Sequence, residues 1–436
     1  MIDRYSTARM RETWSPRHRW DLFLSVEVAY LEALEEDGIA PPGGAARIRD
    51  AVRIDPDRID ALEATLRHDV IAFLTHVEEQ AGDATRFLHY GLTSSDVLDT
   101  TFALQLVQAA ALCREELVAL ERALMDLAER HRGTALAGRT HGMHAEATSF
   151  GLVALGWREM AARALARFDA AAAEIRVGKL SGAVGNLAFG DPAREARVLA
   201  RLGLGVEPAA TQVVARDRHA AFFAAIALAG NVLDHVALNL RHLQRTEVGE
   251  ANEPFGSGQR GSSAMPHKKN PVMCENVCGQ ARLLRSYALA AFEDVALWHE
   301  RDISHSSVER VIAPDATATL EFAAKRLAGI VKGLVVHPDR MAENLARSGG
   351  IIHSEALLLS LVRTGMKRQE AYGLVQRNAL KAIQGDGTFE GNLLADPDVR
   401  LRLSEAEVRA CFSLAEHLRF TDAIFARRSP DPKDPS

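Results

Sequence analysis

The sequence predicts an all-α protein organised around a long helical bundle. Apolar residues recur at steps of three and four over three long stretches, and no alternation of strand and helix patterns is present. Such spacing places one apolar stripe on each helix, and long helices with this spacing require partners along their whole length. We therefore expect oligomerisation. The stripes are Phe102, Leu106, Ala109, Cys113, Leu117, Leu120, Leu124 and Leu127; Phe223, Ile226, Gly230, Leu233, Ala237 and Leu240; and Cys274, Val277, Ala281, Leu284, Ala288, Ala291, Val295 and Trp298.

The third stretch predicts the clearest single helix. It extends from Pro271 to about Glu300, which corresponds to roughly 45 Å at 1.5 Å per residue. Asn270 followed by Pro271 is a typical N-cap and first-turn pair, so these two residues are explained without any catalytic role.

The two ends of the chain differ from its middle. Residues 1–92 carry short helical patterns broken by APPGG and IDPDRID, and the last ninety or so residues read as short helices with a turn at GDGTFEGN. A length of 436 residues is enough for about two or three domains. Short strands are expected near the glycine-rich KLSGAVGNLAFGDP.

Composition excludes several classes of protein. A net charge of −6 argues against a nucleic-acid or anionic-membrane surface. We expect no apolar run long enough to span a bilayer, and MIDRYSTARMRETW is not an apolar signal segment. The cysteines form no disulfide framework or zinc pattern, so the cytoplasm is the expected location. They are Cys113, Cys274, Cys278 and Cys411, of which Cys274 and Cys278 are expected to be small core residues.

Five polar clusters interrupt the helical patterns, namely RHDV, HYGLTSSD, GRTHGMHAE, GSSAMPHKKNP and WHERDISHSSVER. Each permits a purely structural interpretation. Thr93 or Ser94 is expected to cap the following helix, and a lone His141 is more often structural than catalytic. Ser306 and Arg310 are one helical turn apart, which by itself indicates an exposed face.

Other chemistries fit these clusters less well. GSGQRGSS lacks the lysine of a phosphate loop, and no G-x-S-x-G elbow is present. The two histidines of HGMH lack both an HExxH pattern and a marked third ligand for a metal.

The remaining chemistry is elimination. A mobile loop can close over a substrate and exclude water, while lysine and asparagine can hold a carboxylate. A serine beside such cationic groups can act as a base, and a histidine on a rigid helix can return a proton to the leaving atom.

SSAMPHKKNP resembles the signature S-S-x-M-P-x-K-x-N-P of the fumarase/aspartase superfamily. RYS, LRHDVIAF, HYGLTSSD, GRTHGMHAE, TQVVARDRHA and WHERDISHSSVER are similar to the adenylosuccinate lyase family within it, so the resemblance covers essentially the whole chain. One departure is Ala147, where the family usually has proline. Since every polar residue of that motif is present, we interpret this departure as structural.

The resemblance implies a three-domain, nearly all-helical subunit, divided here as residues 1–92, 93–345 and 346–436. Its central domain would be a long five-helix bundle. Four subunits would join their bundles into a core of twenty helices, and three subunits would build each active site.

The resemblance also implies an anti β-elimination that breaks a C–N bond and releases fumarate, without a cofactor or metal. The substrates would be adenylosuccinate, giving AMP, and the succinylated carboxamide ribotide of purine synthesis. Ser262 would be the base, His141 the acid, and Glu275 the carboxylate that orients His141.

The remaining site residues are carried over in the same way. Lys268 and Asn270 would hold the succinyl carboxylates, with Thr93, Ser94, Gln212 and Ser263 nearby, and His68 and His89 would line the site. The nucleotide phosphate would be surrounded by Arg4, Tyr5, Arg301, Ser306 and Arg310. Arg67 and Asp69 would complete the contacts to base and ribose.

Two alternatives stay open at this point. A sister lyase of the superfamily would release fumarate from another N-succinyl substrate, but it would have little use for Arg4, Arg301 and Arg310 together. A structural protein that kept the fold and lost the activity would be expected to lose His141, Ser262 or Lys268, and all three are present.

Overall fold

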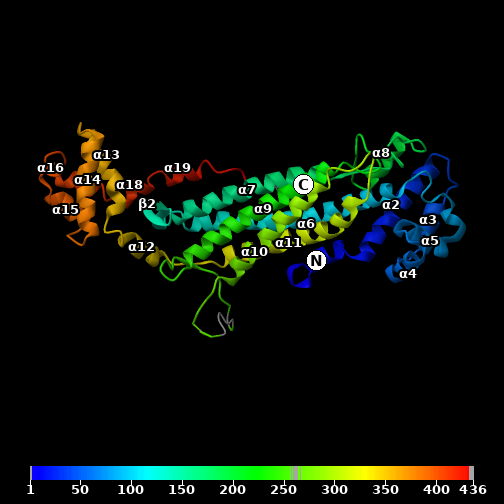
Figure 1. Cartoon of the computed structure of the whole chain (residues 1–436), viewed down its shortest axis with the longest axis horizontal. Helices are drawn as coiled ribbons and strands as arrows, with labels where there is room; N and C mark the ends of the chain where they lie inside the picture. Colours follow the sequence, from blue (N-terminus) through cyan, green and yellow to red (C-terminus); the bar gives the residue numbers. More distant parts are fainter. Residues whose placement is uncertain (1, 257, 259–263, 266, 432–436) are drawn as a thin grey trace. The chain divides into compact units, whose positions relative to one another are not determined.

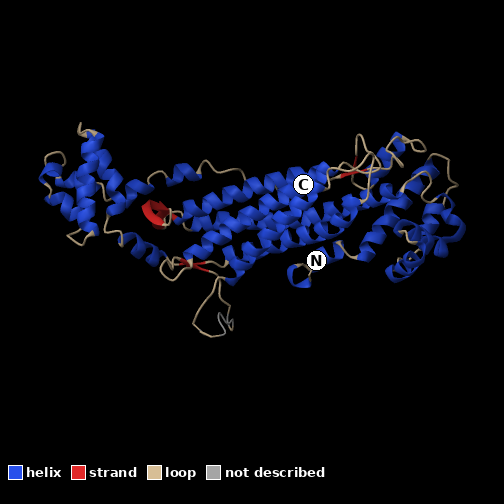
Figure 2. Cartoon of the chain, viewed as in Figure 1, coloured by secondary structure: helices blue, strands red, loops and turns tan. Residues whose placement is uncertain are grey.

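The computed structural model describes residues 2–256, 258, 264–265 and 267–431, and it is predominantly helical, as expected (Figure 2). Strands occur in that part of the chain as three two-stranded sheets. They are β1 (Ala135–Thr140) with β2 (Met143–Ser149), β3 (Val177–Gly178) with β4 (Gly205–Val206), and β5 (Ala251–Asn252) with β6 (Val335–Val336). The expectation of short strands near residues 179–192 is met only by β3, which directly precedes them.

The chain forms two compact units, each made of three segments. Unit 1 contains residues 1–119, 163–234 and 276–326, and unit 2 contains residues 120–162, 235–275 and 327–436. Each boundary falls inside a long helix. These helices are α6 (Ser94–Arg130), α7 (Phe150–Glu174), α9 (Arg216–Leu243), α10 (Val272–Glu293) and α11 (Ser304–Lys332), coloured cyan to yellow in Figure 1. The division into three domains remains a prediction.

Within unit 1 the five long helices pack as a bundle. Apolar contacts connect Phe168 of α7 with Phe222 of α9, whose ring centroids are 5.5 Å apart. A Cβ added to Gly230 of α9 would come within 2.7 Å of Leu284 of α10, so glycine allows these two helices to approach closely.

Hydrogen bonds also join neighbouring helices of the bundle. Arg114 Nε of α6 donates to Asp169 of α7 at 2.9 Å, and Cys113 of α6 donates to the Thr317 carbonyl of α11 at 3.3 Å. Tyr287 of α10 donates to Asp315 of α11 at 3.5 Å. The stripe residues Cys113, Gly230 and Leu284 therefore lie where two helices meet. Cys274 and Cys278 are buried, as expected.

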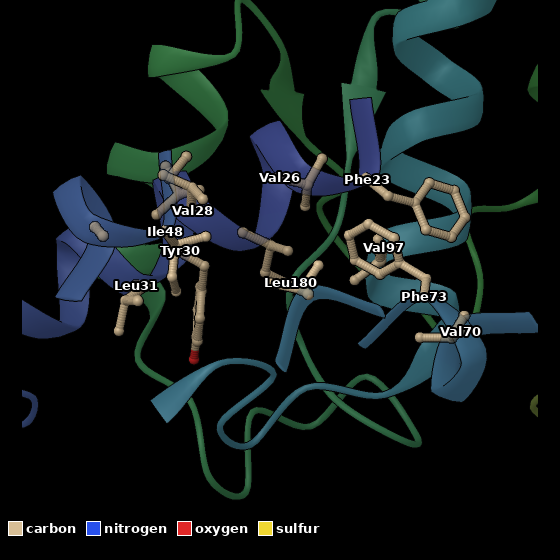
Figure 3. Close-up of a cluster of buried hydrophobic side chains, with 14 of the residues drawn as sticks. Phe23, Val26, Val28, Tyr30, Leu31, Ile48, Val70, Phe73, Val97 and Leu180 are labelled. Atoms are coloured by element: carbon tan, nitrogen blue, oxygen red, sulfur yellow. The ribbon is translucent and has the colours of Figure 1, made fainter. Parts of the chain in front are cut away.

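Shorter helices extend unit 1 at its N-terminal side. An apolar core surrounds α2, and Figure 3 shows Phe23 and Phe73 within it. Trp20, Phe23 and Phe73 pack with ring centroids 4.9–5.8 Å apart. Val97 at the start of α6 and Leu180 join this core. The short elements of unit 1 are η1 (Asp3–Tyr5), α1 (Ala8–Thr13), α2 (Pro16–Glu36), α3 (Gly44–Ala51), α4 (Pro56–Leu66), α5 (Asp69–Ala81), η2 (Gly82–Phe87) and α8 (Pro192–Arg201).

Unit 2 contains the β1–β2 hairpin and a C-terminal group of short helices. The helices enclose their own apolar core, in which Leu357, Leu361, Phe389 and Leu393 are fully buried. The elements are α12 (Pro338–Ala346), η3 (Ile351–His353), α13 (Ser354–Arg363), α14 (Arg368–Ile383), α15 (Phe389–Ala395), α16 (Pro397–Arg400), α17 (Glu405–Ala410), α18 (Leu414–Leu418) and α19 (Thr421–Phe425).

The prediction of one helix from Pro271 to Glu300 is wrong at its C-terminal end. Helix α10 begins at Val272 and ends at Glu293, so it is about 33 Å long. Beyond it, Asp302 accepts hydrogen bonds from the backbone of Trp298 and Ser304, both at 2.8 Å, and starts α11. The apolar spacing continued through Trp298, but that side chain is largely exposed.

Helix α9 contradicts the expectation that no apolar run is long enough to span a bilayer. By length and composition alone it could cross a membrane, with a mean hydropathy of 1.7 over its most apolar window. Of that window, 61% is buried inside the structure, as in the core helix of a globular bundle.

Candidate active site

A cavity of about 390 Å³ opens within unit 1 among four arginines and three aromatic rings. Arg301, Ser306 and Arg310 line it together, so these three predicted phosphate-binding residues share one space. Ser306 and Arg310 lie one turn apart on α11, as their spacing indicated. The rest of the lining includes Arg19, Trp14, Trp20, Phe102, Ser95 and Gln105.

Asp69 bridges two of the guanidinium groups. Its Oδ2 lies 3.3 Å from Arg19 and 3.0 Å from Arg310. Burial alone would raise the pKa of Asp69, but the charge of Arg19, a backbone hydrogen bond from Val70 and the charge of Arg310 hold that pKa below its ordinary value. Asp69 is therefore a fixed anion that orients Arg310 at the edge of the cavity.

Arg301 is held from a different direction. It lies in the connection between α10 and α11 and not at the end of a long helix, because α10 ends at Glu293. It donates to the Gln212 side chain at 2.6 Å, and the Gln212 backbone N–H donates to the Glu300 carbonyl at 3.3 Å. Two predicted substrate-binding residues thus form one hydrogen-bonded pair.

A buried ion cluster forms one wall of the cavity. Arg216 of α9 contacts the Asp99 carboxylate at 2.6 and 2.9 Å and approaches Glu309 to 3.0 Å. All three side chains are buried and line the cavity. The charges of Asp99 and Glu309 outweigh the effect of burial and raise the pKa of Arg216, so the cluster is a permanently charged support.

The RHD residues stand at a junction between two helices. Arg67 ends α4 in the left-handed region, with φ of 57°, and His68 caps α5 by accepting the Ile71 N–H at 3.5 Å. Arg67 and His68 are exposed, whereas Asp69 is partly buried. Helix capping thus explains the local conformation, and the exposed side chains of Arg67 and His68 can still contact a substrate.

Thr93 directly precedes α6 and Ser94 is its first residue, but the side-chain capping bond runs in the opposite direction to the one predicted. The Asp96 carboxylate accepts the Thr93 N–H at 2.8 Å. The same fully buried carboxylate accepts backbone N–H groups of Ser181 and Gly182 at 3.1 Å and forms an ion pair with Lys179. Asp96 therefore fixes two loops at once.

His89 and Tyr5 are also placed by neighbouring side chains. His89 has a φ of 58°, and the buried Glu27 accepts its backbone N–H at 2.9 Å and contacts its Nδ1 at 2.5 Å. Tyr5 packs edge-on against Phe322 of α11 at 5.5 Å, while Arg4 is exposed.

His141 lies in the turn of the β1–β2 hairpin of unit 2, so the expectation of a histidine on a helix is wrong. Thr140 pairs with Met143, which leaves a two-residue loop, His141–Gly142, with φ values of 54° and 79°. Positive φ at both positions is the signature of the tight turn that joins two twisted strands. His141 is exposed at the tip.

The hairpin is anchored by Arg139. Its guanidinium donates to the two oxygens of Glu250 at 2.6 and 2.9 Å, and the Glu250 carboxylate also accepts from Asn344 at 2.8 Å. Glu250 is fully buried. Ala147 is buried opposite Ala137 in the strand pair, which agrees with the structural interpretation of this position.

The signature loop is described only in part. Ser262 and Ser263, the predicted base and its neighbour, lie outside the described residues. Lys268 is exposed and its N–H donates to the Met265 carbonyl at 3.0 Å, while Asn270 is half-buried. Glu275 is exposed in the first turn of α10. No bond joins it to His141 within the described part of this one chain, so that pairing remains a prediction.

Three further residues were not predicted from the sequence. Arg19 and Glu27 hold Asp69 and His89, and Lys179 neutralises Asp96. A signal for Glu27 was available, because it is a charged residue in the apolar run VEVAYL of α2. Buried charges in such positions require a partner.

Comparison with known families identifies the chain. A model described as lyase matches residues 7–284, and one described as adenylosuccinate lyase C-terminus matches residues 350–428. Two solved structures are similar over nearly all of both chains, each with a TM-score of 0.88 at 28% identity. They are a fumarate lyase from Mesorhizobium sp. BNC1, covering 98% of this chain and 100% of its own, and a 3-carboxy-cis,cis-muconate lactonizing enzyme from Pseudomonas putida, covering 97% and 96%.

Sequence relatives narrow the assignment. Proteins named adenylosuccinate lyase from Thermotoga maritima, Synechocystis sp. and Bacillus subtilis are 44%, 46% and 43% identical to this chain. Each alignment covers 98% of this chain and 99% of the relative. The chain therefore belongs to the adenylosuccinate lyase family of the fumarate-releasing lyases.

Proposed function

We propose that this chain eliminates fumarate from adenylosuccinate to give AMP, and from the succinylated carboxamide ribotide to give the free carboxamide. The observation that carries this proposal is identity of 42–46% with relatives of that name over 98% of the chain. The shared cavity of Arg301, Ser306 and Arg310 supports a phosphorylated substrate, since guanidinium groups suit phosphate oxygens.

The reaction requires two proton transfers. Ser262, as the base, takes the proton from the carbon β to the nitrogen, and a carbon–carbon double bond forms. The C–N bond breaks, its electron pair stays on nitrogen, and His141 donates a proton to that nitrogen. The hairpin turn and the Arg139–Glu250 pair support the role of His141, because they fix the backbone that carries this exposed residue.

The negative charge on the substrate requires fixed cations and donors. Lys268 and Asn270 are assigned to the succinyl carboxylates, where they also stabilise charge that develops as the proton leaves. Thr93, Ser94, Gln212, Ser263 and His68 are assigned to neighbouring contacts, with His89, Arg4 and Tyr5 completing the anion site and Arg67 and Asp69 the base and ribose contacts.

We further propose a homotetramer in which three subunits build each site. Unit 1 leaves large apolar side chains exposed on its long helices, including Leu289 and Phe292, three residues apart on α10. Leu289 is 62% exposed, and Leu228 of α9 and Val311 of α11 are also exposed. Exposed apolar surface of this kind is typical of subunit interfaces. Assembly would also bring Glu275 of one chain to His141 of another.

The experiment that tests the reaction is direct. Purified protein is incubated with adenylosuccinate, and fumarate and AMP are quantified together. Equal molar amounts of both products are expected. Release of fumarate from a phosphate-free N-succinyl compound, with no turnover of adenylosuccinate, would instead establish a sister lyase. We also place the enzyme in the cytoplasm, where its four cysteines would stay reduced.

A further inference from the structure

Glu27 is a charged residue in the middle of an apolar helix. It lies on α2 between Val26 and Val28, and its side chain is completely buried. An ionised carboxylate in such a place is costly unless a cation and hydrogen bonds compensate it. The compensation recorded in the structure comes from one residue, His89.

Glu27 and His89 make two contacts, one through the His89 backbone and one through its ring. One Glu27 oxygen accepts the backbone N–H of His89 at 2.9 Å, and the other lies 2.5 Å from Nδ1. The first contact stabilises a backbone with φ of 58°, which is unfavourable for a residue with a side chain. The second fixes the rotation of the ring. Backbone and ring are therefore held by the same carboxylate.

This arrangement leaves Nε2 as the remaining polar atom of the ring. Within the part of the chain that the structure describes, Nε2 makes no hydrogen bond, and the His89 side chain is 18% exposed. The His89 carbonyl accepts the Leu92 N–H at 3.3 Å, so the ring directly precedes the Thr93–Ser94 segment at the start of α6.

Charges from two neighbouring helices favour the imidazolium. Burial alone would lower the pKa of His89, but the hydrogen bond and charge of Glu27 on α2, with a further contribution from Asp96 on α6, hold it above its ordinary value. Asp96 is itself neutralised by Lys179, so Glu27 is the dominant partner.

We propose that Glu27 is a positioning residue that keeps His89 in its imidazolium form and directs Nε2–H toward an anionic group of the substrate. The substrate part of this inference rests on the proposed function. The anion is a carboxylate of the succinyl group or the nucleotide phosphate, which an imidazolium recognises in the same way.

The test compares Glu27→Gln with the wild-type tetramer. Glutamine keeps the size and one acceptor but removes the charge. The value of kcat/KM is expected to fall about 10- to 100-fold, the range for loss of a hydrogen bond to a charged group. Because charged His89 is the competent form, kcat/KM falls as pH rises through its pKa, and Glu27→Gln should move this decline to lower pH.

A double-mutant cycle separates positioning from simple destabilisation. In a His89→Gln background, Glu27→Gln should cause little further loss, because Glu27 acts through His89. Glu207→Gln is the control, since Glu207 is another buried carboxylate, paired with Arg218 at 2.7 Å. It should reduce stability without shifting the pH profile. A full, additive loss from Glu27→Gln would overturn the proposal.

A measurement without substrate tests the role of Glu27 independently of the proposed reaction. The His89 resonance of histidine-labelled protein, identified by its absence in His89→Gln, is titrated with pH. Titration at or below the ordinary histidine pKa in the wild type would overturn the role of Glu27, even if Glu27→Gln failed to fold. Adding fumarate or inorganic phosphate then shows which anion shifts the resonance, and a response to neither would overturn the anion assignment. Failure to release fumarate from adenylosuccinate would overturn only the proposed function.

Discussion

Arg139 binds the fully buried carboxylate of Glu250 through two hydrogen bonds of 2.6 and 2.9 Å, two residues before the turn that carries His141. A two-point contact fixes both the position and the orientation of the strand. Asn344 of α12 donates to the same carboxylate at 2.8 Å, so the hairpin is attached to the helix that packs on β1.

The first prediction removes this anchor. Glu250→Gln deletes the charge opposite Arg139, and breaking a buried ion pair from one side is expected to cost about 3 kcal/mol in the free energy of unfolding. Turnover should fall as well, since His141 loses its fixed position. Urea unfolding and steady-state kinetics measure the two effects. Glu247→Gln removes an exposed partner of Arg245 and should change stability by less than about 0.5 kcal/mol.

The second prediction concerns the phosphate. Arg310→Met should raise KM for adenylosuccinate about 10- to 100-fold, because a charge-assisted contact present in both ground and transition states is lost. The dephosphorylated succinyladenosine should be affected much less. Arg9→Met, which breaks an exposed ion pair with Glu115, serves as the control and should leave both KM values unchanged. Equal losses on the two substrates would contradict the phosphate assignment.

The third prediction concerns the acid and the base. His141→Ala and Ser262→Ala should each lower kcat by about 10²- to 10⁴-fold, while substrate binding is largely retained, because each removes one of the two proton transfers. Isothermal titration calorimetry and single-turnover kinetics distinguish the two quantities. Near-normal turnover in either variant would exclude that residue from its assigned role.

The fourth prediction concerns the shared site. When the inactive His141→Ala and Ser262→Ala tetramers exchange subunits, some sites would contain both intact residues, and activity should return. Mass spectrometry confirms that mixed tetramers have formed. If mixed tetramers stayed inactive, both residues would have to come from one subunit.

The fifth prediction tests the apolar face that would form the tetramer. Leu289→Asp places a charge on the exposed side of α10 and should convert the assembly to smaller species, as measured by light scattering during gel filtration. Leu401→Asp alters another highly exposed leucine, in unit 2, and should leave the mass unchanged. A tetramer that persists with Leu289→Asp would mean that this face is not the interface.

The sixth prediction follows from a carboxylate whose protonation changes on folding. Burial, and then the charge of Glu309, raise the pKa of Asp294 from an ordinary 3.8 to about 6, and its Oδ2 has no partner among the described residues. The unfolded chain therefore ionises first as pH rises, so the wild type loses stability between about pH 4 and pH 6. Asp294→Asn should remove this loss, and should be more stable than the wild type by about 1–3 kcal/mol at pH 8 and equally stable at pH 4.

Asp302 provides the contrasting case. Hydrogen bonds from Ser304 and Trp298 lower its pKa to about 2, so its contribution to stability is present above the unfolded value and is lost as pH falls through about 2. Asp302→Asn should therefore be less stable than the wild type at pH 8. Thermal melting of both variants across pH measures the two opposite dependences. The same direction of change in both would contradict this account.

The sequence predicted the long helices correctly where the three- and four-residue spacing of apolar residues alone determines the structure. The stripes of α6, α9 and α10 follow from spacing alone, and Ser306 and Arg310 were predicted to share a helix face. The same signal failed after Glu293, because apolar residues at Val295 and Trp298 continued the spacing while Asp302 capped a new helix.

The site was harder to predict because its geometry depends on contacts between distant residues. The hairpin had a local signal, the His141–Gly142 pair between β-branched and polar residues, but GRTHGMHAE contains few strong strand formers. Nothing in the local sequence indicates that Glu27 meets His89 or that Asp69 meets Arg19, since these contacts depend on how α2, α5 and the segment after η2 pack.

The division of the chain into six alternating segments has a consequence for how this enzyme can be cut or recombined. The five junctions between segments lie within α6, α7, α9, α10 and α11. A break at any of them would expose unpaired N–H and C=O groups on both sides of the cut. Neither unit is a contiguous fragment that could be expressed alone or exchanged with a homologue. A single cooperative unfolding transition is therefore expected, and replacing either unit would require three separate segments to be exchanged together.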